Sequence, residues 1–216
     1  MGHEHHEHDH PADGADPFDD QAAAWDDDPA KVARAAAVAR AVSAAVDLGP
    51  SVRLLEYGAG TGLVTEALQD QVGHLVLADT SAGMRQAIDA KIDSGALRAA
   101  EVWDLDLTTT SVPAEQHGAF DLVVTVMVLH HIADLPPVLA RFAELLAPGG
   151  HLCIGDLEQE DGSFHGEGFA GHHGFERPAL AAQLGAAGFR DVSIEDCTEM
   201  VKHEVTYQVF LAIGTR

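Results

Sequence analysis

The chain has 216 residues, 46% of them apolar, which suits a globular domain large enough to bury its own core. It carries 35 acidic residues against 12 basic ones, for a formal net charge of −23 at pH 7. So acidic a protein repels phosphate backbones and anionic lipid headgroups, and we therefore expect no nucleic-acid partner and no membrane partner.

The N-terminal segment holds a large share of the acid. Residues 1–30 contain ten acidic residues and no lysine or arginine, and residues 1–10 contain five histidines. Because its apolar content is low, the segment 1–17 is predicted to be a disordered tail, followed by a single domain over residues 18–216. Alternating histidines and carboxylates could bind a divalent metal loosely, although a solvated tail is the favoured interpretation.

Three features of the sequence bear on the location of the protein. No signal-peptide pattern begins the chain, and no apolar run reaches the ~18–20 residues that cross a bilayer. The two cysteines, Cys153 and Cys197, form no CxxC motif. These observations favour the cytoplasm, where thiols stay reduced.

Predicted helices and strands alternate from residue 28 onward. The first helix begins at Asp28, which can cap it, has Pro29 in its first turn, and ends at Gly49-Pro50. Further helices are predicted at residues 63–71, 82–92, 134–146 and 176–187. Strands are predicted at residues 52–57, 74–79, about 97–103, 120–128, 151–156, 192–196 and 205–213.

This alternation predicts the fold class. Strands separated by helices of this length form βαβ units and a mostly parallel sheet. The strand at 120–128 is the most apolar and should lie at the centre of the sheet. Pro148-Gly149-Gly150 is predicted to end the helix before it, and residues 157–175 to form a long loop.

A glycine-rich turn follows the first strand. It reads Glu56-Tyr-Gly58-Ala-Gly60-Thr-Gly62, a GxGxG spacing in place of the GxGxxG of dinucleotide sites, and no Walker lysine follows. A carboxylate at Glu56 would repel a pyrophosphate and attract a cationic ligand. The turn therefore favours a ligand without phosphates.

Two more acids end the next strands. Asp79 can accept both hydroxyls of a ribose, and Asp104 or Asp106 could accept from an adenine amino group. Three acids at successive strand ends describe a cup for a positively charged nucleoside. The alternative is a plain tight turn with surface charges around it.

These motifs resemble those of the class I S-adenosylmethionine (SAM) methyltransferases that act on small molecules. The resemblance rests on VRLLEYGAGTG at 52–62, on Asp79 with Ser81 and Met84 after it, on FDLVVTVMVLHHI at 120–132, and on LLAPGG at 145–150. Further runs from Phe18-Asp19 to the final Tyr207-Gln-Val-Phe210 are similar to a type 11/12 branch of these enzymes.

The resemblance implies a Rossmann-like, seven-stranded, mostly parallel sheet with helices on both faces. Its antiparallel C-terminal strand would be inserted beside the fifth. SAM would be the cofactor and S-adenosylhomocysteine (SAH) the product. The cofactor-binding residues that it implies are Glu56, Gly58, Gly60, Gly62, Asp79, Thr80, Met84, Asp104, Leu105 and Val126. Tyr57 departs from the commoner aliphatic or phenylalanine residue, and its hydroxyl needs a partner.

The acceptor site is predicted from the strand ends and the long loop. Its pocket residues are predicted to be Trp25, His130, Phe164, His172 and Phe175, with Trp25 serving either as a lid or as a core anchor.

Histidines are the candidate proton acceptors in this site. His131 and His165 are the candidate general bases, because an imidazole titrates near neutral pH. Structural roles are the alternative: His131 could orient its loop, and Phe175 could belong to the core. The histidines could also bind Zn²⁺ or Ni²⁺ with Glu158, but their spacing matches no standard site, so no metal site is predicted there.

The sequence thus predicts a SAM-dependent methyltransferase acting on an unidentified small-molecule acceptor. Two alternatives stay open. One is a non-catalytic SAM-binding protein that has kept the fold, and the other is a metal-handling protein that uses the histidine-rich tail.

Overall fold

The computed structural model describes residues 18–166 and 168–216. The tail 1–17, predicted to be disordered and to bind metal loosely at most, lies outside the described residues. In chain order the elements are η1 (Asp19–Asp27), α1 (Pro29–Ala45), β1 (Arg53–Tyr57), α2 (Leu63–Leu68), β2 (His74–Ala78), α3 (Ala82–Ser94), β3 (Glu101–Trp103), η2 (Ala114–Gln116), β4 (Phe120–Val126), η3 (Leu129–His131), α4 (Leu135–Leu145), β5 (Leu146–Leu157), α5 (Arg177–Ala186), β6 (Arg190–Lys202) and β7 (Val205–Thr215).

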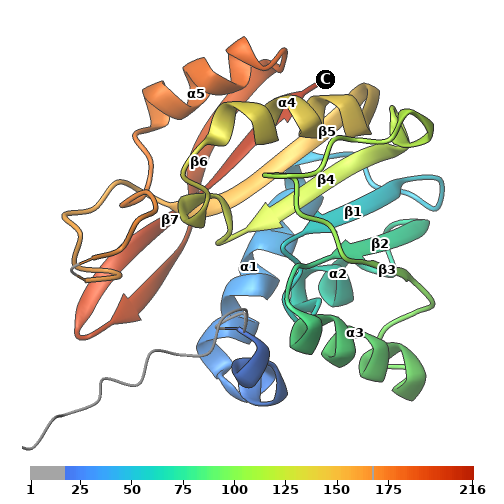
Figure 1. Ribbon diagram of the computed structural model, residues 1–216, viewed down its shortest axis with the longest axis horizontal. Helices are drawn as coiled ribbons and strands as arrows, with labels where there is room; N and C mark the ends of the chain where they lie inside the picture. The colour runs from blue at the N-terminus through green and yellow to red at the C-terminus, as the bar shows by residue number, and fades with distance from the viewer. Residues whose placement is uncertain (1–17, 167) are drawn as a thin grey trace, which may run out of the picture.

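All seven strands form one sheet in the order β3-β2-β1-β4-β5-β7-β6 (Figure 1). The strands from β3 to β5 pair in parallel, while β7 runs antiparallel between β5 and β6. The predicted Rossmann-like architecture is therefore confirmed, including the insertion of the last strand beside the fifth. β4, the most apolar strand, lies at the centre of the order, as predicted.

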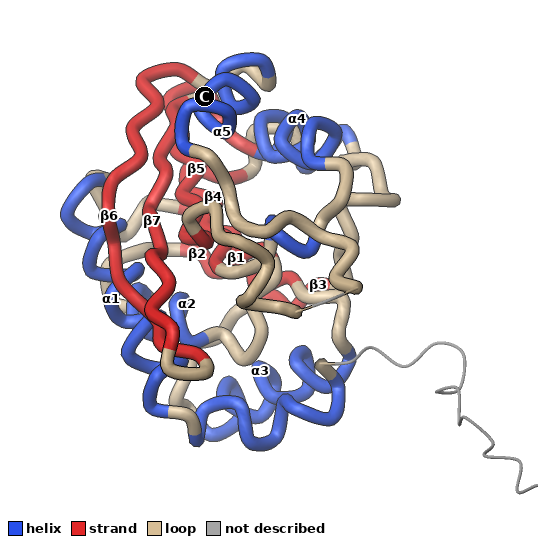
Figure 2. Tube along the Cα trace, turned by 90° about the vertical axis from the view of Figure 1, so that its left-hand side faces the viewer, coloured by secondary structure: helices blue, strands red, loops and turns tan. Residues whose placement is uncertain are grey.

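Helices cover both faces of the sheet. Figures 1 and 2 show α4 and α5 on one side and α1, α2 and α3 on the other. Neighbouring residues of a strand point to opposite faces, so Leu55 packs in the cluster under α4 while Leu54 packs under α1. None of the helices in the described part of the chain is long and apolar enough to cross a bilayer.

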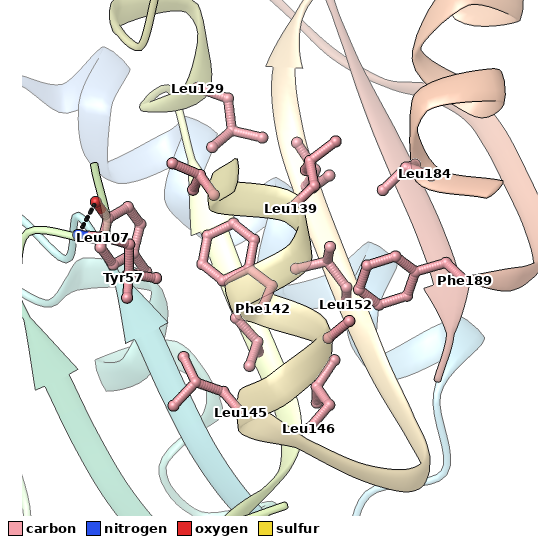
Figure 3. Close-up of a cluster of buried hydrophobic side chains, with 14 of the residues drawn as sticks. Tyr57, Leu107, Leu129, Leu139, Phe142, Leu145, Leu146, Leu152, Leu184 and Phe189 are labelled. Atoms are coloured by element: carbon pink, nitrogen blue, oxygen red, sulfur yellow. Dashed lines mark hydrogen bonds between the residues drawn. The ribbon is translucent and has the colours of Figure 1, made fainter. Parts of the chain in front are cut away.

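The cluster under α4 explains the unusual Tyr57. Its ring packs edge-on against Phe142 of α4, with the ring centroids 5.3 Å apart (Figure 3). Its hydroxyl accepts a hydrogen bond from the Leu107 backbone N–H at 3.1 Å. Tyr57 thus fills the core position and finds the partner that its hydroxyl needs.

Several predicted boundaries were wrong, each because pairing between strands outweighs local signals. Pro148-Gly149-Gly150 does not separate two elements: β5 already begins at Leu146, which pairs with Phe120 before a register shift. This run therefore lies inside β5, at the register shift between β5 and β4. Conversely, β3 has three residues, because only Glu101–Trp103 pairs with β2.

The β6–β7 hairpin is also longer than predicted. β6 extends to Lys202, and its turn residues His203 and Glu204 both have positive φ angles, 51° and 64°. Positive φ at both central residues is the geometry of a tight two-residue turn that follows the strand twist. Because β5 ends at Leu157, opposite Val209, the hairpin tip projects past the sheet and forms a wall of the cavity described next.

Candidate functional site

A cavity of about 790 Å³ opens at the carboxyl ends of β1, β2 and β4. This is the edge of a parallel sheet at which ligands bind in such folds. Its walls come from η1, the start of α1, the glycine turn, η3, the loop after β5 and the tip of the β6–β7 hairpin. The cavity therefore joins segments from both ends of the chain.

The glycine turn at 58–62 forms one end of the cavity and cannot carry side chains at two positions. Gly58 has φ 66°, and a Cβ there would lie 2.3 Å from Cγ2 of Val128. Gly62 has φ 80°, and a Cβ there would lie 2.7 Å from Cδ2 of Leu77. Gly58 and Gly60 line the cavity, whereas Gly62 does not and is the N-cap residue of α2. Of the three predicted glycines, two thus face the cavity.

Two carboxylates flank this turn. Glu56 is 3% exposed, and its Oε2 accepts the backbone N–H of Thr65 at 2.9 Å and the Thr65 hydroxyl at 2.5 Å. Burial raises the pKa of Glu56 to about 7 despite those donors. Asp79 accepts the N–H of Gly60 at 2.7 Å and thereby ties the end of β2 to the glycine turn.

For the third acid, the sequence left Asp104 and Asp106 as alternatives, and the structure shows that Asp106 is the one that lines the cavity. Asp106 and Leu105 line the cavity, whereas Asp104 does not. The Asp104 side chain is 69% exposed, and its carboxylate lies 3.0 Å from the Arg85 guanidinium. The remaining predicted cofactor residues, Thr80, Met84 and Val126, all line the cavity.

The opposite end of the cavity contains a buried histidine–carboxylate pair. His130 is 1% exposed, and its Nδ1 lies 2.6 Å from Oδ1 of Asp156, which is fully buried. Because an ionised carboxylate only accepts hydrogen bonds, Asp156 holds the proton of His130 on Nδ1. The Nε2 atom is then the nitrogen with a lone pair to offer.

Two further imidazoles lie against His130. The ring centroids of His131 and His165 are 4.1 Å and 5.0 Å from that of His130, and the His165 ring stacks on Phe169 at 3.8 Å. Burial, followed by the neighbouring histidines, lowers the pKa of both His131 and His165 to about 4. We call His130, His131 and His165 the histidine cluster. With a pKa of about 4, the rings of His131 and His165 are neutral at pH 7.

The loop after β5 carries His165 into the cavity. Phe164 packs against Tyr207 of β7, with the ring centroids 5.0 Å apart, and its carbonyl accepts from the Lys202 ammonium at 2.6 Å. The adjacent Ser163 hydroxyl lies 2.8 Å from the Tyr207 hydroxyl. The hairpin tip therefore holds this loop in place.

The predicted acceptor-pocket residues divide into two groups. Trp25, His130 and Phe164 line the cavity. His172 and Phe175 do not: the His172 backbone N–H donates to the His130 carbonyl at 2.7 Å, and Phe175 is 7% exposed within the core. These two residues support the site from behind.

Some wall residues were not found from the sequence. Lys31 lies with its ammonium 3.4 Å above the Trp25 ring, and Nη1 of Arg34 lies 3.9 Å from Sδ of Met200. Met127, after β4, has a φ of 58°, an uncommon conformation for a residue with a side chain. Such outliers concentrate at functional sites, so this angle is a signal that only the structure provides.

Comparison with known proteins places the chain among methyltransferases. Residues 20–194 match the model of a family described as a methyltransferase domain. Over 140 residues the chain is 29% identical to the highly reducing polyketide synthase bet1 of Neocamarosporium betae. That match covers 61% of this chain but 5% of the synthase, so the chain corresponds to a small part of this relative.

Solved structures share the fold at low sequence identity. A SAM-dependent methyltransferase from Aquifex aeolicus superimposes with a TM-score of 0.65 at 17% identity, covering 90% of this chain and 97% of that one. The trans-methyltransferase CalH in complex with SAH superimposes with a TM-score of 0.59 at 24% identity, covering 78% of this chain and 52% of that one.

Proposed function

This chain belongs to the methyltransferase domain family, and from that premise we propose that it transfers the methyl group of SAM to a small molecule bound at the histidine-lined end of the cavity. The membership itself confirms the class of enzyme predicted from the sequence, a class I SAM-dependent methyltransferase. It likewise confirms SAM as the cofactor, with SAH as the product left after transfer.

The residues at the glycine turn fit this cofactor. Glu56, Asp79 and Asp106 give that end of the cavity a negative character suited to a nucleoside that carries positive charge, and Gly58 and Gly60, which have no side chain, admit a ligand close to the backbone. We propose that Gly58, Gly60 and Glu56 hold the methionine end of SAM and that Asp79 holds the ribose. Thr80, Met84, Leu105 and Val126 would form the remaining walls, with Asp106 taking the place given to Asp104 by the sequence.

The observation that carries the proposal is that one cavity contains both most of the predicted cofactor residues and the histidine cluster. The glycine turn and the histidine cluster both line it, together with Val126 and Met127 from the end of β4. SAM supplies a methyl group already activated by its positive sulfur. The protein then has to align the acceptor with that methyl group and exclude water.

An acceptor that loses a proton during methylation requires a general base, and the histidine cluster supports that role. His131 and His165 remain the proposed bases, since both rings are neutral at pH 7. His130 is added to them, because Asp156 orients its ring so that Nε2 is available.

A small acceptor is supported by charge and by similarity. A chain with a formal charge of −23 repels nucleic acid, and bet1, which it partly matches, is named as a polyketide synthase. We place the reaction in the reducing cytoplasm. This is supported by Cys153 and Cys197, which are both free thiols.

The decisive assay measures SAH formation from SAM in the presence of small hydroxyl, thiol, amine and activated-methylene compounds. We expect turnover with a member of this panel, and a loss of at least tenfold in kcat when His130, His131 or His165 is replaced by alanine. Turnover that none of the three changes would contradict the role of the cluster. Methylation of an RNA or a protein, with none of the small molecules accepted, would contradict the small-molecule acceptor.

A further inference from the structure

We propose that His130, His131 and His165 together bind one divalent transition-metal ion of the Zn²⁺ class at the acceptor end of the cavity. The inference deepens the proposed function and rests on it for the use of the ion, but the site itself is argued from the geometry of the cluster. Sequence spacing gave no sign of it, because the ligands come from two segments 34 residues apart, His131 in η3 and His165 in the loop after β5.

The three rings are close enough to share an ion. One nitrogen from each lies within 4.8 Å of the other two, in a search of residues 18–166 and 168–216. Zn–N bonds of about 2.0–2.1 Å at tetrahedral angles require nitrogens roughly 3.4 Å apart. The most widely separated nitrogens would therefore have to approach each other by up to about 1.4 Å when the ion binds.

The buried carboxylate of Asp156 completes the arrangement found around metal-binding histidines. A histidine ligand usually donates its second ring N–H to a carboxylate or carbonyl, which fixes the ring and strengthens the ligand. His130 does so to Asp156 at 2.6 Å, and Asp156 Oδ1 also accepts the Leu157 backbone N–H at 2.8 Å. A carboxylate that is fully buried here provides negative charge beside a cation.

The ring of His165 gives a second, independent observation, which concerns the hydrogen bonding of its Nδ1 atom. Its Nδ1 is buried and has no hydrogen-bond partner among the residues that the structure describes. A buried ring nitrogen without a partner is costly, and each such group calls for an explanation. A metal ion is a partner of the right size and chemistry for imidazole nitrogen.

Three protein ligands leave a fourth position facing the cavity, which is the arrangement of catalytic zinc sites. An acceptor hydroxyl, enol or thiol bound there would lose its proton to solvent more readily. The resulting oxygen or sulfur anion attacks the methyl carbon of SAM, the sulfur–methyl bond breaks, and its electron pair remains on the sulfur as neutral SAH. The acceptor class is therefore a small molecule whose reacting atom is itself a metal ligand.

The test uses metal binding, which does not depend on knowing the acceptor. The full-length chain is first freed of metal and of competing sites by changing the tail histidines to asparagine. These are His3, His5, His6, His8 and His10. Zn²⁺ alone is then titrated in competition with a chromophoric chelator, and Co²⁺ alone is followed by its visible absorption. We expect one ion per chain and a Co²⁺ spectrum of tetrahedral strength.

Matched variants locate the ion. His131→Ala or His165→Ala should each weaken Zn²⁺ binding at least 100-fold, and Asp156→Asn should weaken it about 10–100-fold. The exposed His74→Ala and His117→Ala should leave it unchanged. His131 and His165 are the less buried ligands, so their variants remain informative if the Asp156 variant fails to fold.

Each outcome decides the inference. No stoichiometric binding, or binding that is unchanged in both His131→Ala and His165→Ala, overturns it. SAH binding and methyl transfer are measured on the same samples. If both persist without metal binding, the imidazoles act as direct bases and the proposed function stands. If SAH fails to bind, the proposed function fails whatever the metal titration shows.

Discussion

Replacing Glu56 by glutamine should make the protein more stable at alkaline pH. The unperturbed pKa of this carboxyl is 4.5, and burial raises it to about 7 in the folded state. The folded protein therefore binds the proton of Glu56 more tightly than the unfolded chain does. The stability that this provides is fully present below about pH 4.5 and is lost as the pH rises through about 7.

The size of the effect follows from the two pKa values. Ionising Glu56 in its buried position costs about 3 kcal/mol relative to ionising it in the unfolded chain. Glutamine cannot ionise, yet its amide oxygen can still accept from the N–H and hydroxyl of Thr65, as Glu56 does. The advantage of Glu56→Gln should therefore be below about 1 kcal/mol at pH 5 and approach about 3 kcal/mol at pH 8.

Urea unfolding at pH 5, 6, 7 and 8, followed by circular dichroism, measures this difference. The exposed Glu115→Gln is the matched control and should leave the pH profile unchanged. A stability difference between Glu56→Gln and the unaltered chain that does not vary with pH would refute the reasoning. So would a variant that is less stable at pH 8.

The same carboxylate links cofactor binding to pH. If the cationic end of SAM lies beside Glu56, binding favours the ionised carboxylate and releases up to about three-quarters of a proton at pH 6.5, where a carboxyl with a pKa of about 7 is mostly protonated. Calorimetry in buffers of different ionisation enthalpy measures that release, which should be absent in Glu56→Gln. Equal proton release by both proteins would place the charge of SAM elsewhere.

Three other variants test the remaining parts of the structure. Asp79→Asn should weaken SAH binding about 10- to 100-fold by calorimetry, because a charge-assisted hydrogen bond to the ribose is lost; unchanged affinity would remove Asp79 from the site. SAH should quench tryptophan fluorescence in the unaltered chain and in Trp103→Phe but not in Trp25→Phe, since Trp25 lines the cavity and Trp103 does not; quenching that survives Trp25→Phe would argue against this placement. Phe142→Ala should cost about 3–5 kcal/mol in urea unfolding, because its ring is fully buried under α4; a loss below about 1 kcal/mol would contradict that packing.

The fold was predictable where a single segment carries its own signal. The apolar run at 120–128 placed β4 at the centre of the sheet, and Asp28 caps α1 with its carboxylate 2.9 Å from the Ala30 N–H. Where the partner strand decides, local signals failed. β6 runs on to Lys202 because its backbone pairs with β7, although several of its side chains are exposed and polar.

The site residues also fall into those that the sequence could locate and those that it could not. Glu56, Gly58 and Asp79 belong to strand ends, which sequence patterns locate, and all three line the cavity. The pairing of His130 with Asp156 depends on β4 and β5 being neighbours, with Val126 opposite Gly155. The sequence predicted no register for this pair of strands, so this histidine could not be singled out from its neighbours. The direction of a side chain just past a strand was beyond such reasoning, which is why Asp106 and Asp104 could not be told apart.

Two of the acidic residues in η1, Asp19 and Asp26, make specific contacts that the net charge of the chain does not reveal. Asp19 accepts the Ser81 hydroxyl at 2.6 Å and the Gly83 N–H at 2.9 Å, which fixes η1 against the first turn of α3. Asp26 accepts the Thr61 hydroxyl at 2.5 Å and lies 2.6 Å from the Lys91 ammonium, which fixes the other end of η1. Between these two anchors, η1 presents Trp25 to the cavity. Because these carboxylates bind the glycine turn and the start of α3, the wall that carries Trp25 and the turn proposed to bind SAM are held together as one unit.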